Sequence, residues 1–135
     1  MQPQDKHSVP AGLINELRRI VGDAHVSESR TAAELYSYDG SLATGAPGAV
    51  VFPADSAETA RVVKATARSG VPFVPRGFGT NLSGGTVLPY GGLTICLSRL
   101  NRILGINPRN RTAVVQPGVT NLELQNALAP LGFFY

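Results

Sequence analysis

Hydrophobic positions in the first part of the chain repeat with the spacing of an α-helix. Residues 10–22 carry five aliphatic side chains on one predicted helix face: Leu13, Ile14, Leu17, Ile20 and Val21. A second, shorter helix is predicted over residues 31–36, where Thr31 and Glu34 have the spacing of a capping box. The Gly-containing residues 38–48 are expected to form an irregular connection.

A strand–helix–strand pattern follows. Residues 49–53 and 71–75 are short apolar runs bounded by Gly and Pro, which is typical of buried strands. Residues 56–69 between them are predicted to form a helix capped by Asp55 and Glu58. Its inner face is expected to carry Ala60, Val63 and Ala67. Such a βαβ unit has parallel strands, so the pattern predicts an α/β (α+β) fold class.

The second strand leads into a long glycine-rich loop over residues 76–92 instead of another helix. Strand-like segments are then expected at residues 93–97, 103–106 and 112–116. Thr120 and Glu123 predict the start of a last helix, which ends near Gly132.

Length and composition limit the class of protein. A chain of 135 residues is one domain or a piece of one, and 43% hydrophobic with 16% charged residues excludes a wholly disordered chain. The single cysteine, Cys96, excludes a disulfide framework and is expected to be a core residue. No apolar run approaches a membrane span, and the first ten residues lack the apolar stretch of a secretory signal. We expect a cytoplasmic protein, with a position at the periphery of the inner membrane as the alternative.

Charge is unevenly distributed along the chain. Residues 71–135 carry five arginines against one acidic residue, Glu123, whereas the whole chain has a net charge of +3. This asymmetry favours an anionic partner such as a phosphate, a nucleotide or a nucleic acid. A solvated basic surface with no partner is the alternative that charge alone leaves open.

The glycine-rich loop is the segment most suited to chemistry. Glycines just after a parallel strand let backbone N–H groups converge on a ligand, and Thr80, Asn81 and Ser83 add polar side chains suited to phosphate oxygens. A dinucleotide G-x-G-x-x-G motif is excluded because Leu82 stands where its last glycine is required. A P-loop is excluded because Gly85 stands at its lysine position. The loop therefore predicts phosphate binding without phosphate cleavage, and a long surface connection is the alternative.

Other catalytic signals are weak. His7 and His25 lie far apart without paired ligands, so we expect no metal site. No Ser/His/Asp arrangement or carboxylate pair stands out, and we assign no catalytic residue.

Four motifs in order over residues 50–135 resemble the FAD-linked oxidases of the vanillyl-alcohol-oxidase type, which carry a PCMH-type FAD-binding domain. The motifs are V-V-F-P-A-D-S-A-E-T-A, V-P-F-V-P-R-G-F-G-T-N-L-S-G-G, L-S-R-L-N-R-I-L and V-V-Q-P-G-V-T-N-L-E-L. Tyr36, Tyr38 and Asp39 also resemble the segment that precedes them in this family. The similarity is strongest to the branch that contains the glycolate oxidase catalytic subunit and D-lactate dehydrogenase.

The resemblance implies a domain organisation and a site. Residues 1–48 would be a helical lead-in, and residues 49–135 a PCMH-type domain truncated at its C-terminus, with the first FAD-binding subdomain and the start of the second. The loop would hold the FAD pyrophosphate through backbone amides, with residues 117–120 lying against the cofactor. The implied cofactor-binding residues are Pro75, Arg76, Gly77, Phe78, Gly79, Thr80, Asn81, Ser83, Gly84, Pro117, Gly118 and Thr120. The loop has no histidine, so we expect noncovalent FAD, and Phe78 replaces the family's usual Gly or Ala.

The implied function is oxidation of a 2-hydroxy acid of the glycolate or D-lactate type by hydride transfer to FAD. The residues that act on this substrate are expected in parts of the family that have no counterpart in this sequence, so the chain alone is predicted to be inactive. A noncatalytic flavin- or nucleotide-binding remnant is one alternative, and a split subunit completed by a second chain or by other oxidase subunits is another. A nucleic-acid-binding domain is a further alternative that we do not expect.

Overall fold

The computed structural model describes residues 8–135, so His7 lies outside the described residues. The described residues form four α-helices and six strands, in this order along the chain: α1 (Ala11–Val21), β1 (Val26–Ser27), α2 (Arg30–Leu35), β2 (Ala49–Val51), α3 (Ser56–Arg68), β3 (Phe73–Arg76), β4 (Leu93–Cys96), β5 (Ile103–Asn107), β6 (Thr112–Val115) and α4 (Asn121–Leu128). Two 3₁₀ turns, Asp23–His25 and Ala129–Leu131, follow α1 and α4. No helix within residues 8–135 is long and apolar enough to cross a membrane.

The larger sheet has four strands in the order β1-β2-β4-β3. Strands β2 and β3 are both parallel to β4, which lies between them, and β1 runs antiparallel to β2. The predicted parallel strands are therefore confirmed. The sequence pattern did not reveal β1, because two residues are too short to produce an alternating pattern.

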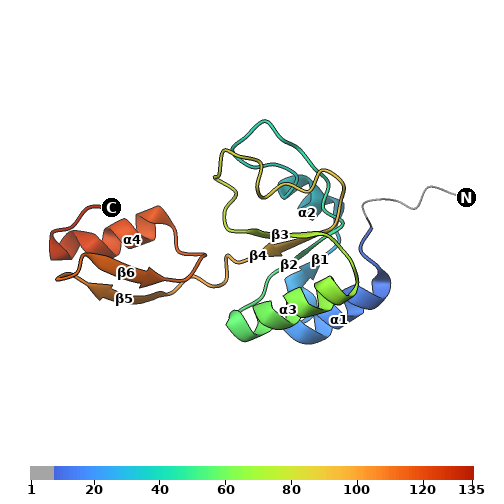
Figure 1. Cartoon of the computed structure of the whole chain (residues 1–135), viewed down its shortest axis with the longest axis horizontal. Helices are drawn as coiled ribbons and strands as arrows, with labels where there is room; N and C mark the ends of the chain where they lie inside the picture. The colour runs from blue at the N-terminus through green and yellow to red at the C-terminus, as the bar shows by residue number, and fades with distance from the viewer. Residues whose placement is uncertain (1–7) are drawn as a thin grey trace, which may run out of the picture.

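The two faces of this sheet are covered differently. Alternate residues of a strand point to opposite faces, and Val51 and Ile95 pack with α1 and α3 in the main core. Val50 and Cys96 pack on the other face with Ala32 of α2. Figure 1 shows α1 and α3 below the sheet, with α2 and the irregular loops above it. Cys96 is buried, as the sequence predicts.

Local capping explains where most helices begin, with one correction. Asp55 accepts a hydrogen bond from the Glu58 N–H at 2.8 Å and caps α3 as predicted. Helix α2 begins at Arg30 because Ser29 accepts from the Ala32 N–H at 3.1 Å, so the capping box predicted at Thr31 is wrong.

The inner face of α3 also differs from the prediction. Val62, Ala65 and Thr66 are its buried residues, whereas Ala60 and Ala67 are exposed and Val63 is half-buried. Alanines are too small to define a helix face. The Thr66 hydroxyl donates to the Val62 carbonyl oxygen at 2.8 Å, and this bond allows a polar residue to be buried.

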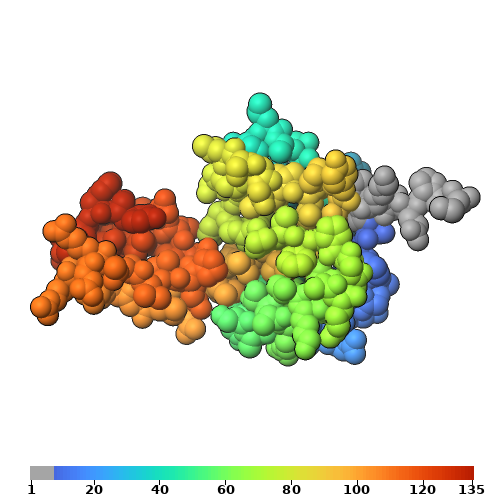
Figure 2. All heavy atoms as spheres, in the orientation of Figure 1, coloured from blue at the N-terminus to red at the C-terminus, as the bar shows by residue number. Residues whose placement is uncertain are grey.

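Strands β5 and β6 form an antiparallel hairpin that packs with α4 and the C-terminal residues. This unit, drawn in orange and red, lies beside the larger body and not on its sheet (Figure 1). In the space-filling view the orange and red atoms form a separate lobe at one side of the body (Figure 2). The predicted strand pair and the last helix are confirmed, and Gly132 ends the helical segment with a left-handed conformation.

Candidate functional site

The glycine-rich loop leaves the carboxyl end of β3 and exposes a run of backbone donors. Within residues 8–135, none of the N–H groups of residues 77–85 finds a hydrogen-bond acceptor. Gly79 and Gly84 have positive φ angles of 71° and 72°, which bend the loop away from an extended path. Consecutive free N–H groups in such a loop are an arrangement that binds anions.

A groove of about 580 Å³ lies between this loop and the segment before α4. Seven of the predicted cofactor residues line it: Gly77, Phe78, Gly79, Thr80, Asn81, Pro117 and Thr120. Four further residues complete the lining: Thr86, Val119, Asn121 and Leu122. Two segments about forty residues apart in sequence therefore form one groove.

The amino end of α4 forms one wall of the groove. The Thr120 hydroxyl accepts a hydrogen bond from the Glu123 N–H at 3.2 Å, and the Glu123 carboxylate accepts from the Thr120 N–H at 2.7 Å. This capping box, predicted from the sequence, is confirmed. The bonds from the Thr120 N–H and hydroxyl lower the pKa of Glu123. Because the cap uses Thr120, the helix presents the N–H groups of Asn121 and Leu122 to the groove, where no helical carbonyl can reach them.

A second set of polar contacts fixes the loop from below. The Asp39 carboxylate accepts hydrogen bonds from the Ser41 N–H at 2.8 Å, the Asn81 side-chain amide at 2.7 Å and the Thr86 hydroxyl at 3.3 Å. Thr86 also lies 3.1 Å from the Asn81 amide oxygen. Hydrogen bonding to Ser41, and then to Asn81, lowers the pKa of Asp39 to about 2. The Asn81 side chain is therefore engaged in holding the loop.

Arg76 lies beneath the loop and does not line the groove. Its guanidinium donates to the Tyr38 carbonyl oxygen at 2.6 Å and lies 5.2 Å from the centre of the Tyr36 ring. Its Nη1 is also 3.4 Å from the Thr86 hydroxyl. Only 6% of Arg76 is exposed. Burial, followed by the neighbouring Cys96, raises the pKa of Tyr36 to about 12.

The remaining predicted site residues lie outside the groove lining. Pro75 belongs to β3, Ser83 is exposed, and a side chain on Gly84 would approach Ala43. Gly118 is buried, and a Cβ there would lie 2.6 Å from the Leu97 carbonyl oxygen. Sequence reasoning missed the roles of Thr86 and Asp39, and the only signal for Asp39 was its place in the family-like segment.

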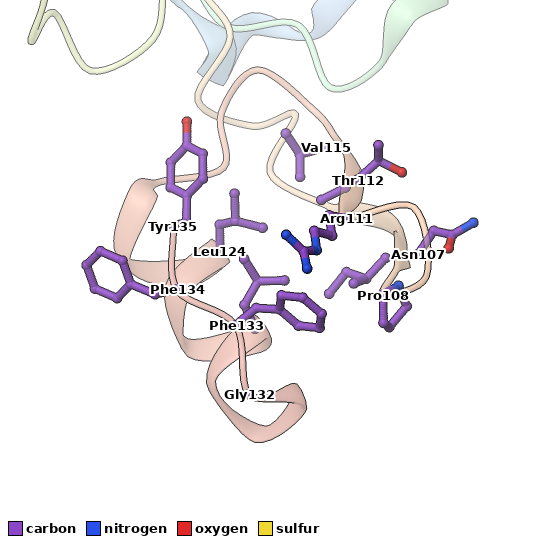
Figure 3. A pocket seen from close by; sticks show the side chains of 13 residues that line it. Asn107, Pro108, Arg111, Thr112, Val115, Leu124, Gly132, Phe133, Phe134 and Tyr135 are labelled. Carbon is purple, nitrogen blue, oxygen red and sulfur yellow. The ribbon is translucent and has the colours of Figure 1, made fainter.

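A second groove of about 630 Å³ lies between the β5–β6 hairpin and the C-terminal residues. Figure 3 shows Phe133 turned toward Pro108 and Arg111, whereas Phe134 points away from them. Phe134 and Tyr135 are exposed by 91% and 64%, respectively.

Comparison with known proteins identifies the family of the chain. Residues 47–135 match the family described as the FAD binding domain. The chain is 38% identical over 121 residues to glycolate oxidase subunit GlcD of Bacillus subtilis, covering 89% of this chain and 26% of that protein. It is 30% identical over 129 residues to the mitochondrial D-lactate dehydrogenase [cytochrome] of Arabidopsis thaliana, covering 94% of this chain and 23% of that protein.

The fold of the chain is also similar to that of solved structures. The crystal structure of p-cresol methylhydroxylase with bound substrate matches with a TM-score of 0.80 at 22% identity, over 92% of this chain and 26% of that one. The chain thus spans about a quarter of the length of the proteins that it resembles. The motif resemblance and the predicted fold class are confirmed. The chain belongs to the family of FAD binding domains, whose cofactor is FAD, and it is similar in sequence to a glycolate oxidase subunit and a D-lactate dehydrogenase.

Proposed function

We propose that the groove holds the diphosphate of FAD, bound noncovalently, as part of a flavin-dependent oxidoreductase that acts on a 2-hydroxy acid of the glycolate or D-lactate type. The run of free N–H groups over residues 77–85 is the observation that carries the proposal. Backbone donors suit a diphosphate because they supply several hydrogen bonds without a competing counter-ion. The loop can adopt this path only with a glycine at position 79, because a Cβ there would strike the Arg76 guanidinium.

The residues of this chain would act by binding and orientation. The loop supplies N–H donors from one side, and Asn121 and Leu122 supply them from the other. Exposed Phe78 and Leu122 give the groove apolar edges, which suit ring systems attached to a diphosphate. The loop carries no histidine or cysteine to which a flavin could be attached, and this supports noncovalent binding. When bound, FAD accepts the hydride that leaves the α-carbon of the 2-hydroxy acid.

The substrate and the reaction belong to the proposal for the longer protein. The groove contains no histidine, carboxylate or other base, so nothing in its lining can take a proton from a hydroxy acid. We therefore propose that the 135-residue chain alone oxidises neither glycolate nor D-lactate. The names of the relatives support this substrate class, and the groove residues support only the binding of the cofactor.

Retention of flavin tests the cofactor part of the proposal. The chain is mixed with FAD and desalted, its visible spectrum is recorded, and the dissociation constant is measured by calorimetry. We expect weak but saturable binding of one FAD per chain. A folded chain that shows no saturable FAD binding would reject the proposed function.

A charge variant makes the test specific to the groove. Asn121→Asp adds a negative charge where the diphosphate would lie, and an acidic residue in the first turn of α4 is compatible with the helix dipole. We expect its affinity for FAD to fall by about tenfold, since like charges at this range repel by more than 1 kcal/mol. Asn110→Asp makes the same change in net charge in the exposed β5–β6 turn, outside the groove, and should leave FAD binding unchanged.

A further inference from the structure

Arg76 is a buried cation without a carboxylate partner among residues 8–135. The ion pairs of this part of the chain join Arg18 to Glu28, Arg30 to Glu34 and Arg68 to Glu16, all on the surface. Buried charges in proteins are normally paired, because removal from water is costly. The Arg76 guanidinium instead rests on the Tyr36 ring and the Tyr38 carbonyl oxygen.

The nearest carboxylate does not neutralise this charge directly. Asp39 reaches Arg76 only through the Thr86 hydroxyl, which lies 3.3 Å from Asp39 and 3.4 Å from Arg76. The other bonds of Asp39 come from Ser41 and Asn81, so its charge is already shared among neutral donors. The guanidinium thus has no carboxylate in direct contact.

This charge lies against the inner side of the proposed anion site. Thr86 and Gly79 both line the groove, and the Arg76 guanidinium touches each of them from below. A positive charge at this depth is poorly screened by water, so its field reaches across the loop into the groove. An anion in the groove would place further negative charge near Arg76.

We propose that Arg76 is a positioning residue whose buried charge stabilises the bound diphosphate through the loop, without touching it. This inference rests on the proposed function, because it assumes that the groove binds FAD. Residues 71–135 have a net charge of +4 from five arginines and one glutamate. The proposal assigns a function to one of these arginines, which acts on the ligand from inside the fold. It also separates two roles within the loop, in which backbone N–H groups make the contacts and Arg76 supplies the charge.

Two substitutions separate charge from packing. Arg76→Met keeps a long side chain over Tyr36 but removes the charge, and Arg76→Lys keeps a charge that can be titrated. We expect Arg76→Met to weaken FAD binding by about tenfold or more, because a nearby opposite charge favours an ionised group by that factor. Arg76→Lys should retain most of the affinity at about pH 6, where the ammonium is protonated.

The pH profile of Arg76→Lys is the decisive measurement. A buried lysine loses its proton more easily than an exposed one, so its FAD affinity should fall between about pH 6 and pH 9. The wild-type arginine stays charged throughout this range. The other titratable groups that face this position are Tyr36, Asp39 and Cys96, and both proteins contain them, so the wild-type profile corrects for their contribution.

The outcomes distinguish the inference from the proposed function. A wild-type chain that is folded but binds no FAD would reject the proposed function and the inference with it. Wild-type affinity in Arg76→Met, or parallel pH profiles of the lysine variant and the wild type, would reject the inference alone. If Arg76→Met does not fold, the pH profile of Arg76→Lys still decides the question.

Discussion

Gly79→Ala is the substitution that most directly tests the packing of the loop on Arg76. Gly79 has a φ of +71°, and a Cβ there would strike the Arg76 guanidinium. A left-handed conformation costs a non-glycine residue about 1–2 kcal/mol. The guanidinium can move away only by giving up its hydrogen bond to the Tyr38 carbonyl oxygen in a buried site, which costs about 1–3 kcal/mol more. We therefore expect the free energy of unfolding to fall by about 2–5 kcal/mol, a large part of the 5–15 kcal/mol typical of a domain.

Gly70→Ala separates the two contributions. Gly70 has a similar φ of +65°, but a Cβ there would meet no atom within 4 Å. Its substitution should cost only the backbone part, about 1–2 kcal/mol. Urea unfolding of both variants, followed by circular dichroism, measures the difference. Equal losses in the two variants would refute the packing of Gly79 on Arg76.

One further prediction concerns the stability of the loop contacts at acid pH, and another concerns the packing of the core. The pKa of Asp39 is about 2 in the fold and 3.8 for the unperturbed group, so its contribution is complete above about pH 4 and is lost as pH falls through about 2. The melting temperature of Asp39→Asn should therefore decrease less than that of the wild type as the pH falls from about 4 to about 2. An equal decrease in both proteins would contradict the role of the Asp39 charge. Leu17→Ala, at a fully buried position of α1, should lower the free energy of unfolding by about 2–5 kcal/mol. Leu35→Ala, at a position 57% exposed, should change it by less than about 0.5 kcal/mol, and similar losses in both would contradict the assignment of the core.

The sequence predicts features of this fold that depend on neighbouring residues. The cap of α3 at Asp55 and that of α4 at Thr120 could be predicted because each bond joins residues three positions apart. The position of β4 between β2 and β3 could not be predicted, because strand order depends on contacts between segments distant in sequence. The prediction of the buried face of α3 was wrong, because the small side chains of this helix are compatible with more than one buried face.

The candidate site shows the same division. The loop could be predicted from its glycines. The groove residues before α4 could be predicted from the resemblance to the FAD-linked oxidases. The inward orientation of Arg76 could not be predicted, because an arginine in a phosphate-binding loop is expected from the sequence to contact the ligand. Only the combined positions of Tyr36, Tyr38 and Thr86 place its guanidinium beneath the loop.

The position of the groove follows from the register of two parallel strands. Arg76 and Cys96 are register partners at the carboxyl ends of β3 and β4, so the glycine-rich loop and residues 97–100 leave the sheet side by side. The Gly118 N–H donates to the Leu100 carbonyl oxygen at 2.8 Å, which brings residues 117–122 against the same edge. The groove wall before α4 is therefore held by the end of β4 and not by the loop itself.

Gly118→Ala tests this account of the groove. A Cβ at Gly118 would lie 2.6 Å from the Leu97 carbonyl oxygen and 2.9 Å from that of Leu100, both of them backbone atoms that cannot rotate away. The segment must shift away from β4, so we expect weaker FAD binding together with a loss of about 1–3 kcal/mol in the free energy of unfolding. Amide signals of the loop in NMR spectra of the ligand-free variant should stay close to those of the wild type, because the loop is held separately by Asp39. Unchanged FAD affinity would mean that the groove wall does not contact the cofactor, whereas displaced loop signals would mean that the loop and the wall are held as one unit.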